Sequence, residues 1–98
     1  MMALVAQVVV RAQRAKRGAS GFSGPDTYVA VAVYESGQVV PSLCADAPFP
    51  WKRVGEGYHK SRGARSMLGK ALDRAHALVQ RANTRLEQGV DPATVLGD

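Results

Sequence analysis

The sequence predicts an α+β fold in which a long C-terminal helix covers one face of a small antiparallel three-stranded sheet, in the order β-loop-β-β. Residues 3–11 and 28–35 alternate apolar side chains with a period of two, which is typical of half-buried strands. Residues 61–88 repeat apolar side chains at spacings of three and four, which is the period of an amphipathic helix. Because 98 residues hold one core, we expect residues 1–98 to form a single domain.

The first expected strand, residues 3–11, directs a purely apolar set of side chains toward the core: Leu4, Ala6, Val8 and Val10. A polar segment from Ala12 to Thr27 follows it. Several residues of this segment interrupt both helices and strands, so we expect a mobile loop. They are Gly18, Gly21, Gly24 and Pro25.

Tyr28–Glu35 is the clearest strand of the chain. Ser36-Gly37 and the β-rich run Gln38–Leu43 follow it, which indicates a two-residue hairpin loop and a third strand. In that register Val40 lies across from Val33. Pro41 cannot donate to a strand ladder, so the third strand is expected at an edge. A further short strand at Trp51–Val54 is only weakly indicated, within an irregular stretch from Ala45 to Lys60.

The expected helix runs from Ser61 to about Gln88, and Gly89 is a natural stop after it. Asp91-Pro92 indicates a short turn that begins with an N-cap and a first-turn proline. The helix would be about 39 Å long, against about 27 Å for an eight-residue strand. Either Gly69 interrupts it or its end projects toward a partner. Its apolar stripe comprises Ala64, Met67, Leu68, Ala71, Leu72, Ala75, Leu78, Val79, Ala82 and Leu86.

The sheet face opposite the helix is expected to stay open, although it is too apolar for an ordinary solvated surface. We therefore expect this face to be an interface, most simply in a homodimer. The residues assigned to that interface are Val5, Val9, Tyr28 and Tyr34.

The net charge is +5, and the cations are clustered. One cluster lies at the start of the 12–27 loop, and a second leads from the irregular stretch into the helix. Clustered cations attract polyanions, of which phosphate backbones are the commonest. The residues predicted to contact nucleic acid are Arg11, Arg14, Lys16, Arg17, Lys60, Arg62 and Arg65.

The helix carries a further row of cations beside its apolar stripe, with spacings of four, seven and four: Lys70, Arg74, Arg81 and Arg85. Such a row can follow a phosphate backbone. The alternative interpretation is that the aliphatic stems cover the margin of the core while the charges stay in water.

Catalytic chemistry is not predicted. The eight acidic residues fall mostly in loops, turns or chain ends, where paired carboxylates are not held together. Cys44 and His59 would form a nucleophile–base pair only if the fold brought them together. The single cysteine excludes an internal disulfide and a multi-cysteine zinc site. We expect no catalytic residue, no metal and no cofactor.

The N-terminal apolar run precedes its basic residues, unlike a secretory signal, and no stretch approaches the ~20 apolar residues that cross a bilayer. The expectation is a cytoplasmic, basic, non-enzymatic binding domain with no membrane partner. Nucleic acid or another polyanion is the expected partner. The alternative is a protein-interaction or dimeric accessory module that uses the apolar sheet face.

Overall fold

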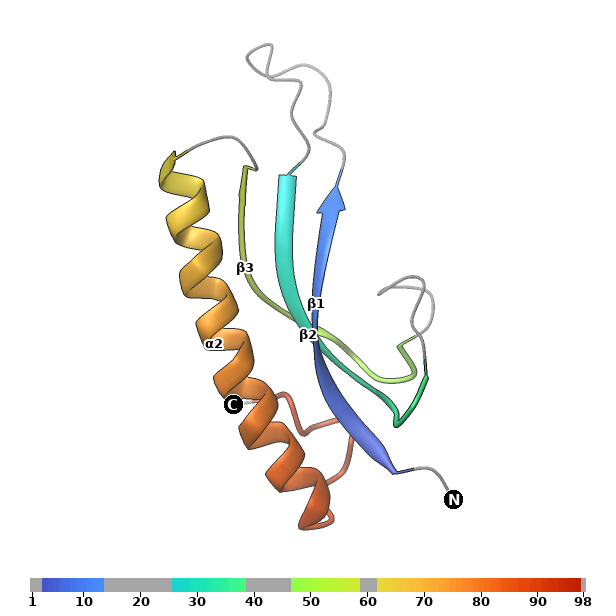
Figure 1. The fold of residues 1–98 in the computed structure, drawn as a ribbon. Coiled ribbons are helices and arrows are strands. Elements are labelled where there is room, and N and C mark those ends of the chain that lie inside the picture. The colour runs from blue at the N-terminus through green and yellow to red at the C-terminus, as the bar shows by residue number, and fades with distance from the viewer. Residues whose placement is uncertain (1–2, 14–25, 39–46, 59–61, 98) are drawn as a thin grey trace.

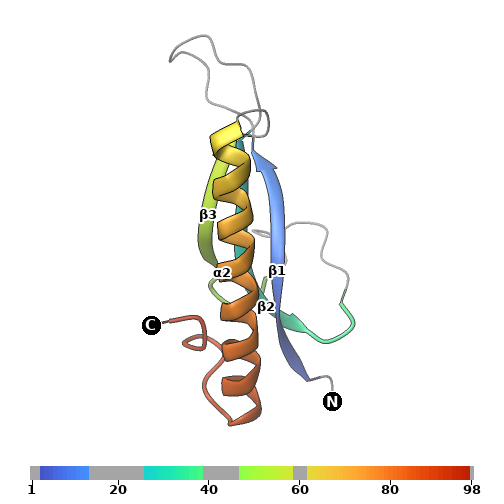
Figure 2. The ribbon, with the colours of Figure 1, turned by 60° about the vertical axis from the view of Figure 1, so that its left-hand side comes forward.

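A computed structural model describes residues 3–13, 26–38, 47–58 and 62–97 (Figure 1). Its elements, in chain order, are β1 (Leu4–Gln13), β2 (Asp26–Glu35), β3 (Lys52–Tyr58) and α2 (Arg62–Glu87). The strands form one antiparallel sheet of order β1-β2-β3. The helix α2 covers one face of this sheet, with β3 to one side of it and β1 to the other (Figure 2). The predicted fold class is confirmed.

The first two strands are longer than the sequence analysis predicted. The β1–β2 ladder is continuous from Leu4↔Glu35 to Gln13↔Asp26. The polar residues at the end of the ladder belong to the strands because their backbones pair across the ladder. The alternation of apolar and polar side chains does not reveal this backbone pairing. The expected loop is correspondingly shorter than Ala12–Thr27, and residues 14–25 lie outside the described residues.

The third strand of the described sheet is Lys52–Tyr58, in a region where only a short strand at Trp51–Val54 was weakly indicated. The turn expected at Ser36-Gly37 is present, since the Gln38 N–H donates to the Glu35 carbonyl at 3.1 Å and Gly37 has a φ of 85°. Residues 39–43 of the third strand predicted from the sequence lie outside the described residues. The described third strand contains two glycines, so it is held by tertiary packing rather than by its own strand propensity.

The helix packs through small side chains. Ala71, Ala75 and Ala82 have no exposed surface. They lie on the predicted stripe, so the period of the sequence identified the buried face correctly. Met67 belongs to the same stripe but is 58% exposed, one turn before the fully buried Ala71.

Glycine at position 55 permits the closest approach between α2 and the sheet. A Cβ added at Gly55 would lie 2.6 Å from the Cβ of Ala71, far inside van der Waals contact. Neither Gly55 nor Ala71 has a flexible side chain that can move aside. The absence of a side chain at Gly55 therefore sets the distance between β3 and α2.

The helix ends as the sequence predicted. Gly89 has a φ of 85°, its N–H donates to the Leu86 carbonyl, and the Val90 N–H donates to the Arg85 carbonyl, which together form a Schellman motif. The Asp91 carboxylate accepts from the Ala93 N–H and opens the expected turn.

The C-terminal turn covers the end of α2. Val95 is fully buried and Leu96 is 6% exposed, and both belong to the core between α2 and the sheet. The helix continues through Gly69 without a break. Its overhang beyond the strands is therefore covered in part by the chain's own C-terminal segment. Among the described residues, no helix is both long and apolar enough to cross a membrane.

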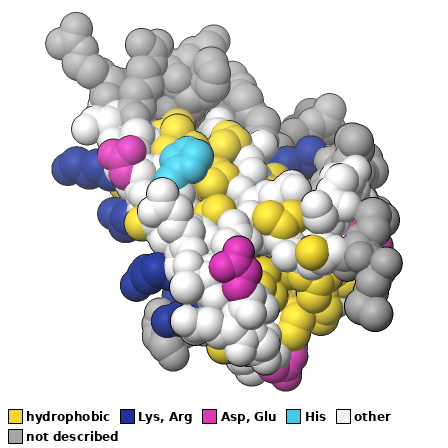
Figure 3. Space-filling model, turned by 60° about the horizontal axis from the view of Figure 1, so that its bottom comes forward, with side chains coloured by type: hydrophobic (Ala, Val, Ile, Leu, Met, Phe, Trp, Pro, Cys, Tyr) yellow, Lys and Arg dark blue, Asp and Glu magenta, His cyan; other side chains and the backbone are white. Residues whose placement is uncertain are grey.

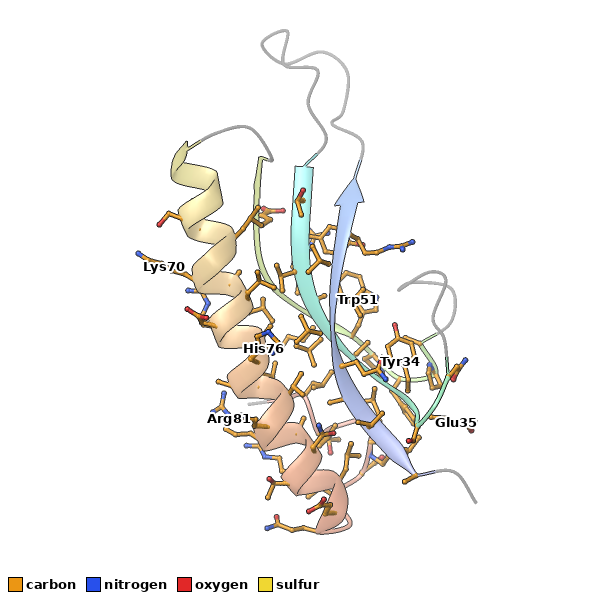
Figure 4. All side chains as sticks on the ribbon, in the orientation of Figure 1. Tyr34, Glu35, Trp51, Lys70, His76 and Arg81 are labelled. Carbon is orange, nitrogen blue, oxygen red and sulfur yellow. The ribbon has the colours of Figure 1, made fainter. Side chains whose placement is uncertain are left out.

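The second face of the sheet is not open, contrary to the expectation from the sequence. Tyr28, Ala30, Ala32 and Tyr34 form a second buried cluster, against which Val9, Ala47 and Trp51 pack. Trp51 and Tyr34 lie on the side of the sheet away from α2 (Figure 4). The stretch before β3 crosses this face, a long-range contact that strand periodicity does not predict.

Two Gly→Ala variants test the close approach at Gly55. Gly55→Ala forces a methyl group against Ala71, so we expect it to lower the free energy of unfolding by about 1–3 kcal/mol. Gly69→Ala is the matched control, because a Cβ there meets nothing within 4 Å. It should raise the free energy of unfolding by about 0.5–1 kcal/mol through helix propensity. Urea denaturation of both variants measures these changes, and an unchanged stability of Gly55→Ala would contradict the packing described.

Candidate functional site

The structure describes the backbone positions of three of the seven predicted nucleic-acid contacts. Arg11 lies on β1, half-buried, at one edge of the sheet. Arg62 and Arg65 begin α2, which starts beside the opposite edge. The other four, Arg14, Lys16, Arg17 and Lys60, lie outside the described residues.

A groove of about 520 Å³ lies between β3 and α2. We call it the cationic groove, because five of its described lining residues are Lys or Arg and none is Asp or Glu. The lining residues are Lys52, Arg53, Val54, Arg74, Ala77, Leu78, Arg81, Arg85 and Gly97. In the space-filling view, several Lys and Arg side chains follow one another along one border of the molecule (Figure 3).

The helical side of the groove comes from the cation row that the sequence showed. Arg74, Arg81 and Arg85 line the groove. Lys70 and Arg81 lie on the same side of α2, away from β1 (Figure 4). A spacing of four or seven residues returns a side chain to nearly the same face of a helix, so the row keeps its alignment over the length of the groove.

The strand side of the groove contributes cations on both faces of β3. Lys52 pairs with Val31, whose side chain faces α2, and Arg53 pairs with Ala30, whose side chain faces away. A register shift between Val29 and Ala30 accommodates Val54, which packs with the core beneath α2. The edge strand β3 therefore presents charge to the groove and to the second face of the sheet.

Aromatic rings hold the Arg53 guanidinium. Its Cζ lies 4.3 Å from the Tyr28 ring centroid and 5.9 Å from that of Trp51. The two rings stack with centroids 6.1 Å apart. Arg53 Nη1 also donates to Glu56 Oε2 at 3.0 Å. Cation–π contact and this ion pair hold the Arg53 charge on the second face of the sheet, beside the edge strand that borders the groove.

Two arginines of α2 are placed by the backbone of neighbouring segments. The Arg74 Nη2 atom would lie 3.3 Å from a Cβ at Gly55, so this guanidinium lies close against β3. Arg85 Nη1 donates to the carbonyl oxygens of Val95 and Gly97, each at 3.2 Å. Arg85 thus links α2 to the C-terminal turn, and both Arg85 and Gly97 line the groove.

The residues predicted to form an interface are largely covered by the chain itself. Tyr34 has no exposed surface and Tyr28 is 8% exposed, while Val5 and Val9 are half-buried. The two tyrosines belong to the second buried cluster.

The part of the chain that the structure describes gives little support for metal binding or nucleophilic catalysis. That part has no group of three His, Cys, Asp or Glu placed to hold a metal ion. His76 is exposed on α2. Cys44 and His59 both lie outside the described residues.

The sequence analysis identified the cations on the helical side of the groove but not those on the strand side. The spacing of the cations on α2 was visible, whereas their meeting with Lys52 and Arg53 depends on a strand that was only weakly indicated. The chain matches no protein-family model, no curated protein and no solved structure.

Paired variants test whether Arg85 is structural. Arg85→Ala removes both hydrogen bonds to the C-terminal turn, so we expect the free energy of unfolding to fall by about 1–2 kcal/mol. Arg81→Ala changes the same charge in the same groove, and the structure gives Arg81 no hydrogen bond to another described residue. It should alter stability by less than about 0.5 kcal/mol. Equal losses in chemical denaturation would show that Arg85 does not fix the turn.

Proposed function

We propose that this chain is a small, non-enzymatic domain that binds the phosphate backbone of nucleic acids in the cationic groove. One observation carries the proposal: Lys52, Arg53, Arg74, Arg81 and Arg85 line one groove, and none of its described lining residues is acidic. Five like charges repel one another, and a bound polyanion relieves that repulsion.

The spacing of the cations suits a chain of phosphates. Arg81 and Arg85 are one helical turn apart, which separates neighbouring side chains on one face by about 5–6 Å. Arg74 lies about two turns earlier on the same line. A series of single charges at such intervals favours a repeating anion over an isolated one.

Arginine is the main cation of the groove, and this also supports a phosphate ligand. Its planar guanidinium donates two parallel hydrogen bonds to phosphate oxygens and stays charged at all physiological pH values. The contacts proposed here are to the backbone, so binding is expected to be largely independent of base sequence.

Arg62 and Arg65 remain in the proposal, because they begin the helix that carries the groove. Arg11 lies at the other edge of the sheet and is not part of the groove. The alternative module, with a partner on the sheet face around Tyr34, is less favoured because that side chain is fully buried. A cytoplasmic location belongs to the same proposal.

Salt-dependent binding to a short duplex and to a single strand tests the function. Log affinity should fall linearly with log salt, since phosphate contacts release counterions. The double variant Arg74→Gln/Arg81→Gln should flatten the slope by about one to two units and weaken binding to all sequences alike.

Arg11→Gln is the matched control, because it removes one cation at the opposite edge of the sheet. Its slope should stay that of the unmodified protein. A larger effect of Arg11→Gln than of the double variant would indicate that nucleic acid contacts the cation cluster at the start of the 12–27 loop instead of the groove. Absence of binding to duplex and single strand at about 50 mM salt would overturn the proposed function.

A further inference from the structure

Along the outer edge of β1, the backbone N–H and C=O groups that face away from β2 follow a defined pattern. The Ser36 N–H donates to the Ala3 carbonyl at 2.7 Å, and the register pairs Leu4 with Glu35. Odd-numbered residues of β1 therefore form hydrogen bonds with β2, and even-numbered residues direct their N–H and C=O groups outward. No other strand of the described residues lies beside that edge.

One of these outward groups is already satisfied. The Ala6 N–H donates to Asn83 Oδ1 of α2 at 2.8 Å, which also confirms the outward direction of even-numbered residues. Asn83 thus blocks the edge near the start of β1. Among the described residues, no side chain accepts a hydrogen bond from the next outward N–H groups, those of Val8 and Val10.

The path of α2 explains why only part of the edge is blocked. The helix contacts β3 where Ala71 meets Gly55, and it reaches the edge of β1 three turns later at Asn83. It crosses the sheet obliquely, as Figure 1 also shows. The far half of β1 is left beyond its cover, and Val10 there is 51% exposed.

We propose that the edge from Val8 to Ala12 pairs antiparallel with the same segment of a second copy of this chain. A two-fold axis at Val10 sets Val10 opposite the partner's Val10 and Val8 opposite the partner's Ala12. All of these residues are even-numbered, so their outward groups form hydrogen-bonded pairs. The three strands of each copy then join into one sheet of six.

The register follows from the neighbouring residues. Pairing cannot extend to the Ala6 N–H, because Asn83 occupies it. An axis at Arg11 would set two arginines opposite each other, which is unfavourable in a strand pair. An axis at Val10 sets Arg11 opposite the partner's Val9 and centres the pairing on the uncovered stretch.

The positions of the charged residues allow a second copy of the chain to bind at this edge. Arg11 is the only charged residue of β1, whereas the cationic groove lies at the opposite edge of the sheet. Two copies that each carry +5 therefore meet through the sides farthest from their grooves. β1 also contains no Pro, no Lys and no bulge, which are the usual devices that prevent edge pairing.

Sedimentation equilibrium tests the proposal. The unmodified chain should dimerise reversibly at about 10–500 µM, because one short strand pair buries little area. Val10→Lys should remain monomeric, with its fold checked by circular dichroism. Val90→Lys is the matched control at another exposed valine, 37% exposed, and should still dimerise. A monomeric unmodified chain, or dimers of Val10→Lys, would overturn the proposal.

A cross-linking experiment tests the register. In a Cys44→Ser background, Val10→Cys places two thiols on the axis, where the Cα atoms of a hydrogen-bonded pair are about 5.5 Å apart. A disulfide spans that distance. Val8→Cys should not cross-link efficiently, because the partner's Val8 lies several residues away. Cross-linking through Val8→Cys but not through Val10→Cys would refute an axis at Val10.

Discussion

The approach of α2 to β3 at Gly55 and Ala71 determines where the other elements lie. A methyl group at Gly55 would come within 2.6 Å of the Ala71 Cβ, so only a glycine allows the helix to lie this close. Further along, Ala75 and Ala82 continue the contact with fully buried small side chains. Because the helix is so near, the arginines on its flank and the cations of β3 border the same groove. A bulkier residue at Gly55 would move the two sides of the groove apart.

The same packing brings like charges together, and their repulsion costs free energy. Contacts made by individual cations reduce this cost. Arg85 donates to two carbonyl oxygens of the C-terminal turn, and Arg53 lies over Tyr28 and pairs with Glu56. These contacts hold two cations without neutralising the groove as a whole. A groove lined by several cations has a positive potential, which favours association with a polyanion.

The sequence predicted the elements whose pattern is local. Alternation located β1 and β2, the spacing of apolar residues located α2, and Gly89 marked its end. It failed where long-range packing decides. The strand β3 contains Gly55 and Gly57, which weaken its strand signal, and it forms because α2 and β2 pack against it. The cover that Trp51 provides on the second face, and the groove itself, are likewise contacts between segments distant in sequence.

We propose that phosphates bind in the groove between β3 and α2. The most direct test is a nuclear magnetic resonance titration of the isotope-labelled protein with a short oligonucleotide at low salt. If phosphates bind in the groove, the largest shifts should fall on Lys52–Val54, on Arg74–Arg85 and on Gly97, and Leu4–Arg11 should be little changed. Largest shifts on Leu4–Arg11, with the groove residues unchanged, would contradict it.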